Sequence, residues 1–494
     1  MSTPAKRPAA LLRFPPAPGI SIIPDRATLP WLLAAVAAAA LIARAPVLWA
    51  ALAATGLAVA VVTLVRPWMG LVLLALVTPF AAVRPVSLAG VSVDASDLLL
   101  ALIVAAWLGQ GVVRRRITLP AAPLTWPLVG FLVVASWSLL AAVSLREALP
   151  ELVKWLQVLL LYWCVAALLP PQRVGWLLAA LVAAGVGQAL IGLYQFFTQA
   201  GPEGFILFGR FMRAYGTYRQ PNPYAGYLGL VAPLALSLSL LAWSPEGRML
   251  RWRRLLRFAL PAATAVIAAG LLVSWSRGAW LAFVAATTAV AVVYLRRASP
   301  AVLFVGGVAV LALLAAISVN SLPPWLVQRF SDLGSFFGMV DVRRVEVNDA
   351  NFAVVERVAH WLAAAGMWAD HLWLGVGLGN YAVAYSAYAL PRWQDPLGHA
   401  HNVYLNFGAE TGLLGLMAYL VLWTAAVVQA LKAALGRRSL LMAVGAGALG
   451  ALVHATVHNL FDNLWVQHIA LQLGFLLGLI AVLTAEREHD NPHV

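Results

Sequence analysis

A series of long apolar runs limits the possible folds of this chain more than any other feature. Stretches of about 16 to 22 apolar residues recur along nearly the whole sequence, and a helix of this length crosses the hydrocarbon core of a bilayer. Hydrophobic residues make up 62% of the 494 residues and charged residues only 11%. Because a soluble domain cannot bury so much apolar surface, we expect an all-α polytopic membrane protein.

The charged residues and the Pro and Gly breaks between the apolar runs predict about 12 to 14 transmembrane helices. The expected spans are residues 30–43, 46–65, 68–83, 97–113, 125–143, 151–169, 174–198, 223–243, 258–274, 279–295, 300–318, 412–430, 439–458 and 464–484. This pattern divides the chain into a cytoplasmic N-terminal tail at 1–29, a transmembrane bundle at 30–318, a periplasmic loop at 319–411, C-terminal transmembrane helices at 412–484 and a cytoplasmic tail at 485–494. The first segment is rich in Pro and basic residues and lacks the short apolar core of a signal peptide.

The net charge of +14 comes mainly from Lys and Arg in short loops between the expected spans. With the N-terminus inside, these loops fall on one side, which the positive-inside rule identifies as the cytoplasm, so both termini are expected there. Arg44 and Arg84 are exceptions. The basic charge therefore implies no nucleic-acid partner, and the lone Cys164 permits neither an internal disulfide nor a cysteine metal site. The two long polar connections, 199–222 and 319–411, then lie outside.

The most informative polar stretch runs from Leu397 to Asn406 and continues to Gly415. It places His399, His401 and Glu410 next to an expected apolar span, where ionisable groups are costly unless they are paired or functional. His399 could orient a substrate or be a mere neighbour of His401. For Glu410, placed on the first turn of the following helix, pairing with a histidine is possible, and a favourable interaction with the helix dipole is the preferred interpretation.

Arginines recur on the same expected face. Arg219 lies in the loop before residue 223, Arg277 in the turn between two spans, and Arg357 in the long loop. A guanidinium offers a planar fork of donors that matches phosphate oxygens, so these residues suit a diphosphate. The alternative is that they anchor helix ends by reaching the lipid headgroups, although external arginines run against the usual charge bias.

These residues lie in four motifs that resemble the O-antigen ligase-like family of bacterial membrane glycosyltransferases. The motifs are Pro-Asn-Pro-x-Ala-Gly-Tyr at 221–227, Ser-Arg-Gly at 276–278, the stretch from Arg357 to Tyr381, and the His-Asn pair that leads into Glu-Thr-Gly-Leu-Leu-Gly at 410–415. Together they cover roughly residues 216–430. The family includes O-antigen ligases, O-antigen polymerases and some protein O-oligosaccharyltransferases.

The resemblance implies a GT-C-type fold and a reaction on the periplasmic face of the bacterial inner membrane. In such a reaction, an undecaprenyl-diphosphate-linked glycan is transferred with inversion to an acceptor hydroxyl, without a metal or another cofactor. The essential residues of the family match His401, as general base, and Arg219 and Arg277. We also expect Arg357, His399, Asn402 and Asn222 to bind substrate.

Ligation to a lipid A core is the favoured reaction, ahead of polymerisation of lipid-linked units and transfer to protein. The acceptor groove has no short motif, so the sequence specifies neither the acceptor, the sugars nor the oligomeric state. The alternative from another functional class is a transporter of lipid-linked glycans. A transporter is expected to show internal repeats or ionisable residues near the middle of spans, whereas the notable charges of this sequence lie at the expected external ends.

Two further patterns in the sequence predict local features. His454, His458 and Asp462 recur at a spacing that would place them on one helix face, as metal ligands can be, but polar contacts at an external helix end are the preferred interpretation. The segment from Val354 to Trp368 has apolar residues at helical spacing, which predicts an amphipathic helix lying over the site.

Overall fold

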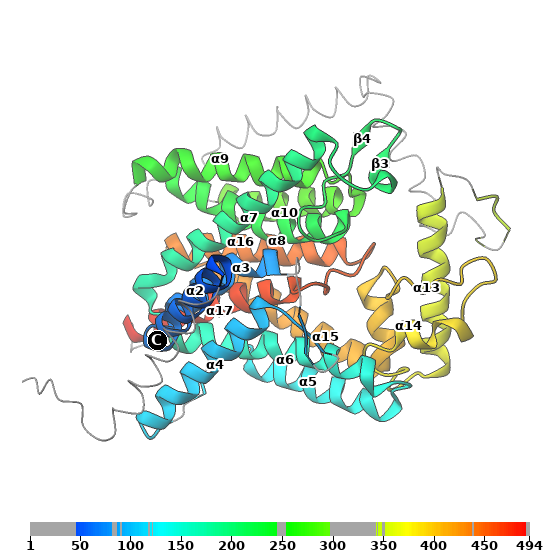
Figure 1. Ribbon diagram of the computed structural model, residues 1–494, viewed down its shortest axis with the longest axis horizontal. Helices are drawn as coiled ribbons and strands as arrows, with labels where there is room; N and C mark the ends of the chain where they lie inside the picture. Colours follow the sequence, from blue (N-terminus) through cyan, green and yellow to red (C-terminus); the bar gives the residue numbers. More distant parts are fainter. Residues whose placement is uncertain are drawn as a thin grey trace, which may run out of the picture. The chain divides into compact units, whose positions relative to one another are not determined.

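The computed structural model describes residues 46–81, 86–88, 91–116, 119–120, 122–244, 253–296, 342, 344–347, 351–436 and 439–490, and these are helical almost throughout (Figure 1). The helices are α2 Val47–Val65, α3 Pro67–Ala81, α4 Ala95–Val113, α5 Thr125–Ser138, α6 Leu145–Leu168, α7 Val174–Thr198, α8 Pro221–Trp243, α9 Arg253–Leu272, α10 Arg277–Leu295, α13 Phe352–Asp370, α14 Tyr381–Ala384, α15 Val403–Ala434, α16 Ser439–His458 and α17 Ile469–Asp490. In the described residues, strands occur only in two short antiparallel hairpins, β1 Val86–Leu88 with β2 Val91–Val93, and β3 Ile206–Leu207 with β4 Phe211–Met212.

Within the described residues, eight helices are long and apolar enough to cross a membrane, and four shorter apolar helices accompany them. Each expected span that falls in this part of the chain is a helix, so the prediction of an all-α polytopic membrane protein is confirmed. The spans expected at 30–43 and 300–318 and the tail at 1–29 lie outside the described residues.

The chain forms two compact units, Met1–Val61 and Val62–Val494, and the site described below lies entirely in the second. At the centre of this unit, α8 packs against α16 and α9, while α17 packs on α6 and α15 packs on α16 and α5. Small residues allow α8 and α16 to approach closely: a Cβ added at Gly447 would come within 2.7 Å of the Leu234 backbone. Such small-residue contacts are typical of helix packing in membranes, where burial of apolar surface gives no driving force.

Helix α15 is longer than predicted and is kinked. It begins at Val403, not at residue 412, so Glu410 lies near the end of its first segment and the expected first-turn position is wrong. At Gly412 the backbone leaves the helical region, with φ 65° and ψ −165°. The amides beyond the kink instead donate to the segment before α14: Leu413 N–H bonds the Leu372 carbonyl at 2.7 Å.

The segment before α14 also donates a hydrogen bond back to α15. Val376 N–H donates to the Ala409 carbonyl at 2.9 Å, and Gly375, with φ 66°, lies so close that an added Cβ would be 2.3 Å from the Glu410 carbonyl carbon. A Cβ at Gly412 would similarly be 2.2 Å from the Trp373 carbonyl carbon. Only glycine combines a positive φ with such a close approach at no steric cost. The two glycines therefore join the long connection to the helix that follows His401.

The amphipathic helix predicted at 354–368 is present as α13. One face, which includes Val355, Ala359 and Ala363, is buried, and the helix packs on α15. Trp361 Nε1 donates to the His401 carbonyl at 3.3 Å. Helix α13 therefore covers the His motif, as the sequence predicted.

Candidate functional site

His401 precedes α15, with Asn402 between them as the N-cap residue. The Asn402 side chain accepts hydrogen bonds from the amides of Tyr404 and Leu405, and its amide group donates to the Leu460 carbonyl at 3.1 Å. Residues with an oxygen at this position stabilise helix starts because the first amides have no partner in the helix. The contacts of Asn402, predicted to bind substrate, thus fix the start of α15 and hold it to the connection after α16.

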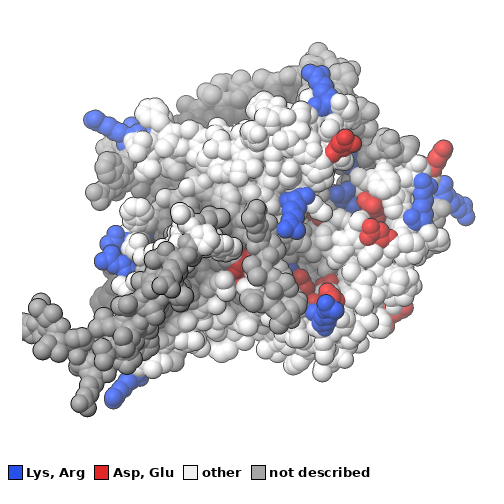
Figure 2. Space-filling model, viewed as in Figure 1, with Lys and Arg blue, Asp and Glu red and all other residues white. Residues whose placement is uncertain are grey.

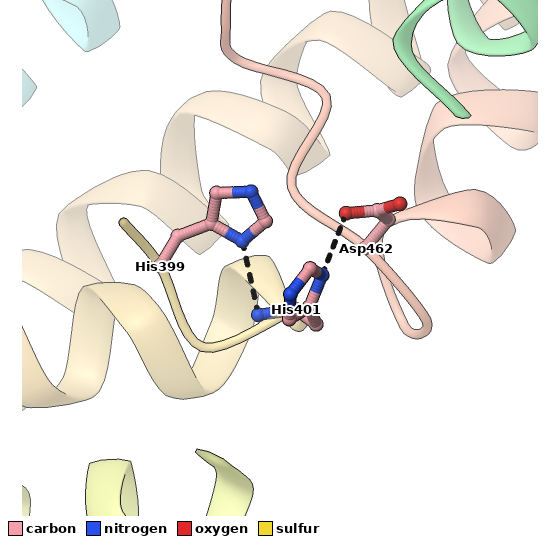
Figure 3. A group of neighbouring side chains, drawn as sticks. All are labelled: His399, His401 and Asp462. Carbon is pink, nitrogen blue, oxygen red and sulfur yellow. Dashed lines mark hydrogen bonds and ion pairs between the residues drawn. The ribbon is translucent and has the colours of Figure 1, made fainter. Parts of the chain in front are cut away.

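The His401 ring is held by a carboxylate from a distant part of the chain. Nδ1 lies 3.2 Å from Oδ1 of Asp462, which follows the end of α16 (Figure 3). Because an ionised carboxylate only accepts, Nδ1 carries the proton and Nε2 is left with a lone pair. Nε2 is buried and has no hydrogen-bond partner among the described residues. A histidine arranged in this way is suited to accept a proton from a substrate.

Asp462 is buried, yet it is held as an anion. Burial raises the pKa of this carboxyl, but the hydrogen bond from His401 and electrostatic interactions with the neighbouring histidines and Arg357 outweigh it and lower the pKa well below its usual range. A depressed carboxyl pKa means that the charged form, and its contact with His401, is lost only as the pH falls through that low value. The partner of His401 therefore stays ionised throughout the neutral range.

Neutral histidines surround this pair. The His399 Nδ1 accepts a hydrogen bond from the His401 amide at 3.1 Å, and the two rings are 4.4 Å apart (Figure 3). Loss of hydration and the repulsion that a second proton on the neighbouring His401 would exert lower the pKa of His399 to about 3. On α13, His360 contacts the Tyr381 hydroxyl at 2.9 Å, and the same two causes lower its pKa to about 4. His399 and His360 are thus uncharged at neutral pH.

Asn222 links Asp462 to an arginine that the sequence analysis did not single out. The Asn222 amide donates to Asp462 Oδ2 at 2.6 Å, and its oxygen accepts from Arg213 Nη2 at 3.0 Å. Arg213 Nε also donates to the Ser274 carbonyl at 3.0 Å. A continuous set of hydrogen bonds therefore runs from Ser274 through Arg213, Asn222 and Asp462 to His401. It joins the motif at 221–227 to the His-Asn motif and ends two positions before the Ser-Arg-Gly motif.

The predicted arginines occupy different environments. Arg277 is the half-buried first residue of α10, three positions after Ser274. Arg357, on α13, donates from Nε to the Phe461 carbonyl at 3.2 Å, and its charge acts on the neighbouring Asp462. Arg219 is exposed, with a left-handed φ of 59°, in the turn before α8. The contacts of Arg357 place it at the His401 site, and Arg213 belongs there as well.

Glu410 has a structural position and no histidine partner among its described contacts. It is buried and accepts the Tyr381 amide at 3.2 Å, which ties α14 to α15. Hydrogen bonding to a backbone amide is the kind of contact that a buried carboxyl needs. The preferred helix-dipole interpretation does not describe it, because Glu410 lies at the end of the first segment of α15.

The three polar residues predicted on one helix face separate in the structure. Helix α16 ends at His458, so Asp462 lies beyond it and contacts His401 and Asn222. His454 is fully buried against Gly229, and its ring is 5.4 Å from that of His458. Within the described residues, one combination whose possible ligand atoms lie within 4.8 Å of one another is His399, His401 and Asp462, in which Nδ1 of both histidines is already engaged in hydrogen bonds.

Comparison with known proteins places part of this site in a known family. Residues 262–420 match the protein family described as O-antigen ligase. This range contains Arg277, Arg357 and His401, whereas the hydrogen-bonded partners Arg213, Asn222 and Asp462 lie outside it. A comparison with curated proteins gave no match. The match over residues 262–420 supports an O-antigen ligase-like family and a function of the O-antigen ligase or polymerase type.

Proposed function

We propose that this protein transfers a glycan from undecaprenyl diphosphate to a hydroxyl of a lipid A core, on the periplasmic face of the bacterial inner membrane. One observation carries the proposal: His401 presents a buried Nε2 without a partner among the described residues, while the anionic Asp462 holds Nδ1. This is the arrangement that a general base requires. His401 lies within residues 262–420, which match the O-antigen ligase family, whereas Asp462 lies beyond them.

In the proposed reaction, His401 Nε2 takes the proton of the acceptor hydroxyl as that oxygen attacks the anomeric carbon of the donor sugar. The bond between this carbon and the phosphate oxygen breaks, and its electron pair leaves with the lipid diphosphate. Attack from the face opposite the leaving group inverts the anomeric centre. Asp462 stabilises the imidazolium that forms, and a diphosphate needs no acid to leave.

Arginines are proposed to bind the donor diphosphate and to stabilise the charge that develops as its bond to the sugar breaks. Arg277 and Arg219 keep this role from the sequence analysis. Arg213 and Arg357 are added because their contacts reach Asp462, through Asn222 and through electrostatic interaction. Asn222 then orients Asp462 and Arg213, and His399 is proposed to orient the acceptor.

The positions of these groups favour catalysis at a membrane surface over transport. Asn222 lies in the first turn of α8, Arg277 opens α10, and His401 precedes α15. A transporter binds its substrate near the middle of the bilayer, whereas this cluster lies at helix ends. Figure 2 shows Lys and Arg at both ends of this face, whereas Asp and Glu lie from its middle to the right-hand end, on the side of α13.

A transfer assay with purified protein in lipid nanodiscs tests the proposed function. A polyprenyl-diphosphate-linked glycan is offered with a lipid A core, with a second lipid-linked unit or with a serine-containing peptide, in excess chelator. We expect glycosylated lipid A core as the product, at a rate that the chelator leaves unchanged. Product on the second lipid-linked unit alone would identify a polymerase. Loss of transfer in chelator, restored by one divalent ion, would contradict the metal-independent mechanism.

The arginines can be tested by changes that keep their charge. In Arg277→Lys and Arg219→Lys, the cation is retained and the bidentate fork is lost. We expect each change to lower turnover about tenfold, equivalent to about 1.4 kcal/mol of transition-state stabilisation. The measurement is the initial rate at saturating donor, normalised to folded protein in the membrane.

Arg254→Lys is the matched control. Arg254 is exposed in the first turn of α9 and belongs to the basic residues that are expected on the cytoplasmic side. It should transfer glycan at the wild-type rate. If Arg277→Lys and Arg219→Lys do the same, these two arginines only anchor helix ends, and the diphosphate site would have to be assigned to Arg213 and Arg357.

A further inference from the structure

The connection between α16 and α17, residues 459–468, carries Asp462 at one end and a second polar contact at the other. Near its start, the Asn459 carbonyl accepts the Val403 amide and the Phe461 carbonyl accepts Arg357. Beyond Asp462, the Trp465 carbonyl accepts Lys154 Nζ from α6. At its far end is His468, immediately before α17. The residue that holds the proposed base is therefore part of a segment fixed to several helices.

His468 lies between two carboxylates of α4. Its Nε2 is hydrogen-bonded to Asp97 Oδ1 at 3.2 Å, and its Nδ1 is 3.2 Å from Asp94 Oδ2, a charge contact without hydrogen-bond geometry. Each carboxylate uses its other oxygen to cap α4: Asp94 Oδ1 accepts the Ser96 amide, and Asp97 Oδ2 accepts the Asp94 amide. The other two oxygens, Asp94 Oδ2 and Asp97 Oδ1, thus face one ring, which suits a positively charged imidazolium. Asp97 Oδ1 also accepts a hydrogen bond from Gln157 Nε2 at 2.7 Å.

The backbone at this end needs such a restraint. Gln467 and His468 have φ values of 48° and 63°, in the left-handed region. Non-glycine residues in this conformation cost about 1–3 kcal/mol each and persist only where the surroundings hold them. His401 itself has a φ of 51°. If the contact at His468 breaks, the strained end of the connection can relax, and we expect the displacement to reach Asp462 along residues 463–467 of the same segment.

We propose that His468 is a positioning residue for His401, since its paired contact with Asp94 and Asp97 fixes the segment that holds Asp462 against the base. This inference rests on the proposed function only for the expected effect on turnover. His468 contacts neither His401 nor any other residue of the proposed catalytic set in the described structure.

The charge of His468 gives the contact a pH dependence. Burial lowers the pKa of His468, but the hydrogen bond with Asp97 and the charges of Asp94 and Asp97 outweigh it, so the pKa is raised. Lys154, from α6, acts in the opposite direction and is itself paired with Glu151. A raised histidine pKa means that the contact is present below the unfolded-state value and is lost as the pH rises through the folded-state value. Turnover should therefore decline on the alkaline side.

The test compares His468→Gln, which removes the charge, with His468→Arg, which keeps a cation that two carboxylates can share. We expect His468→Gln to lower kcat about tenfold at neutral pH, to leave the donor KM within about twofold, and to abolish the alkaline decline. His468→Arg should retain more activity than His468→Gln and should also lack the decline. The control is His371→Gln, which changes an exposed histidine at the end of α13 and should match the wild type.

Hydrogen exchange provides a measurement that does not depend on glycan transfer. Amides of residues 459–468 should exchange faster in His468→Gln than in the wild type or in His371→Gln. Wild-type kcat or a wild-type alkaline decline in His468→Gln would overturn the inference. If His468→Gln does not fold, His468→Arg decides: a persistent alkaline decline overturns the proposal, and its loss supports it. If the wild type transfers no glycan, the proposed function fails and the exchange result alone tests the contact.

Discussion

Replacing His401 with alanine is expected to lower glycan transfer at least about 1000-fold, because proton removal by a positioned base contributes about 10²–10⁴-fold to such reactions. The substitution removes the unpartnered Nε2 and leaves the cap residue Asn402 in place. Donor binding should be largely retained, since the arginines, not His401, are proposed to bind the diphosphate. The measurements are single-turnover transfer and binding of a polyprenyl diphosphate.

His399→Ala is the matched variant, because His399 is the adjacent histidine and its Nδ1 accepts the His401 amide. We expect it to lose much less activity than His401→Ala. If His401→Ala keeps near wild-type turnover while His399→Ala does not, the base is His399 and the assignment to His401 is wrong.

Asp462→Asn is expected to lower kcat about 100-fold, within the range of acid–base effects. The asparagine keeps the shape of the side chain but removes the anion that stabilises the imidazolium during proton transfer. It can also turn an N–H toward His401 Nδ1 and so favour the wrong tautomer. The measurement is kcat at saturating donor and acceptor, together with thermal unfolding of the membrane-extracted protein.

The control for this prediction is Asn463→Ala, at the next position of the same connection, where the side chain accepts only the local Trp465 amide among its described contacts. It should keep kcat within about threefold of the wild type. Equal loss in both variants would mean that the connection is merely sensitive to any change, and Asp462 would have no specific role with His401.

The membrane-spanning helices could be predicted because their signal is local: an apolar run bounded by charges contains its own evidence. The start of α15 could not, since Asn406, Glu410 and Thr411 interrupt the apolar pattern. In the structure their polar groups are buried and bonded to the first segment of the helix, to α14 or to the amide of Ala400. The kink at Gly412 depends on contacts with a segment forty residues earlier in the sequence. The periodicity of the apolar residues in α15 gives no information about such distant contacts.

Part of the site could also be predicted, because its signal is local in the sequence. His401 and Arg277 stand in compact motifs, whereas Asp462 contacts His401 across 61 positions. The spacing from His454 to Asp462 suggested one helix face, but that inference assumes an uninterrupted helix, and α16 ends at His458. Arg213 gave no motif signal. The signal that could have identified it is its position close to Asn222 in an external connection, because basic residues are unusual there.

The kink in α15 also determines how far the proposed chemistry lies from the lipid chains. A straight helix of 32 residues would be about 48 Å long, well beyond the roughly 30 Å of a bilayer's hydrocarbon core. After Gly412 the helix is about 33 Å long, which matches the bilayer thickness. With this part across the bilayer, we expect the remaining segment, about 14 Å, to extend past the hydrocarbon boundary and to place His401 in the headgroup region. There a glycan can keep its hydration while its lipid anchor stays in the membrane.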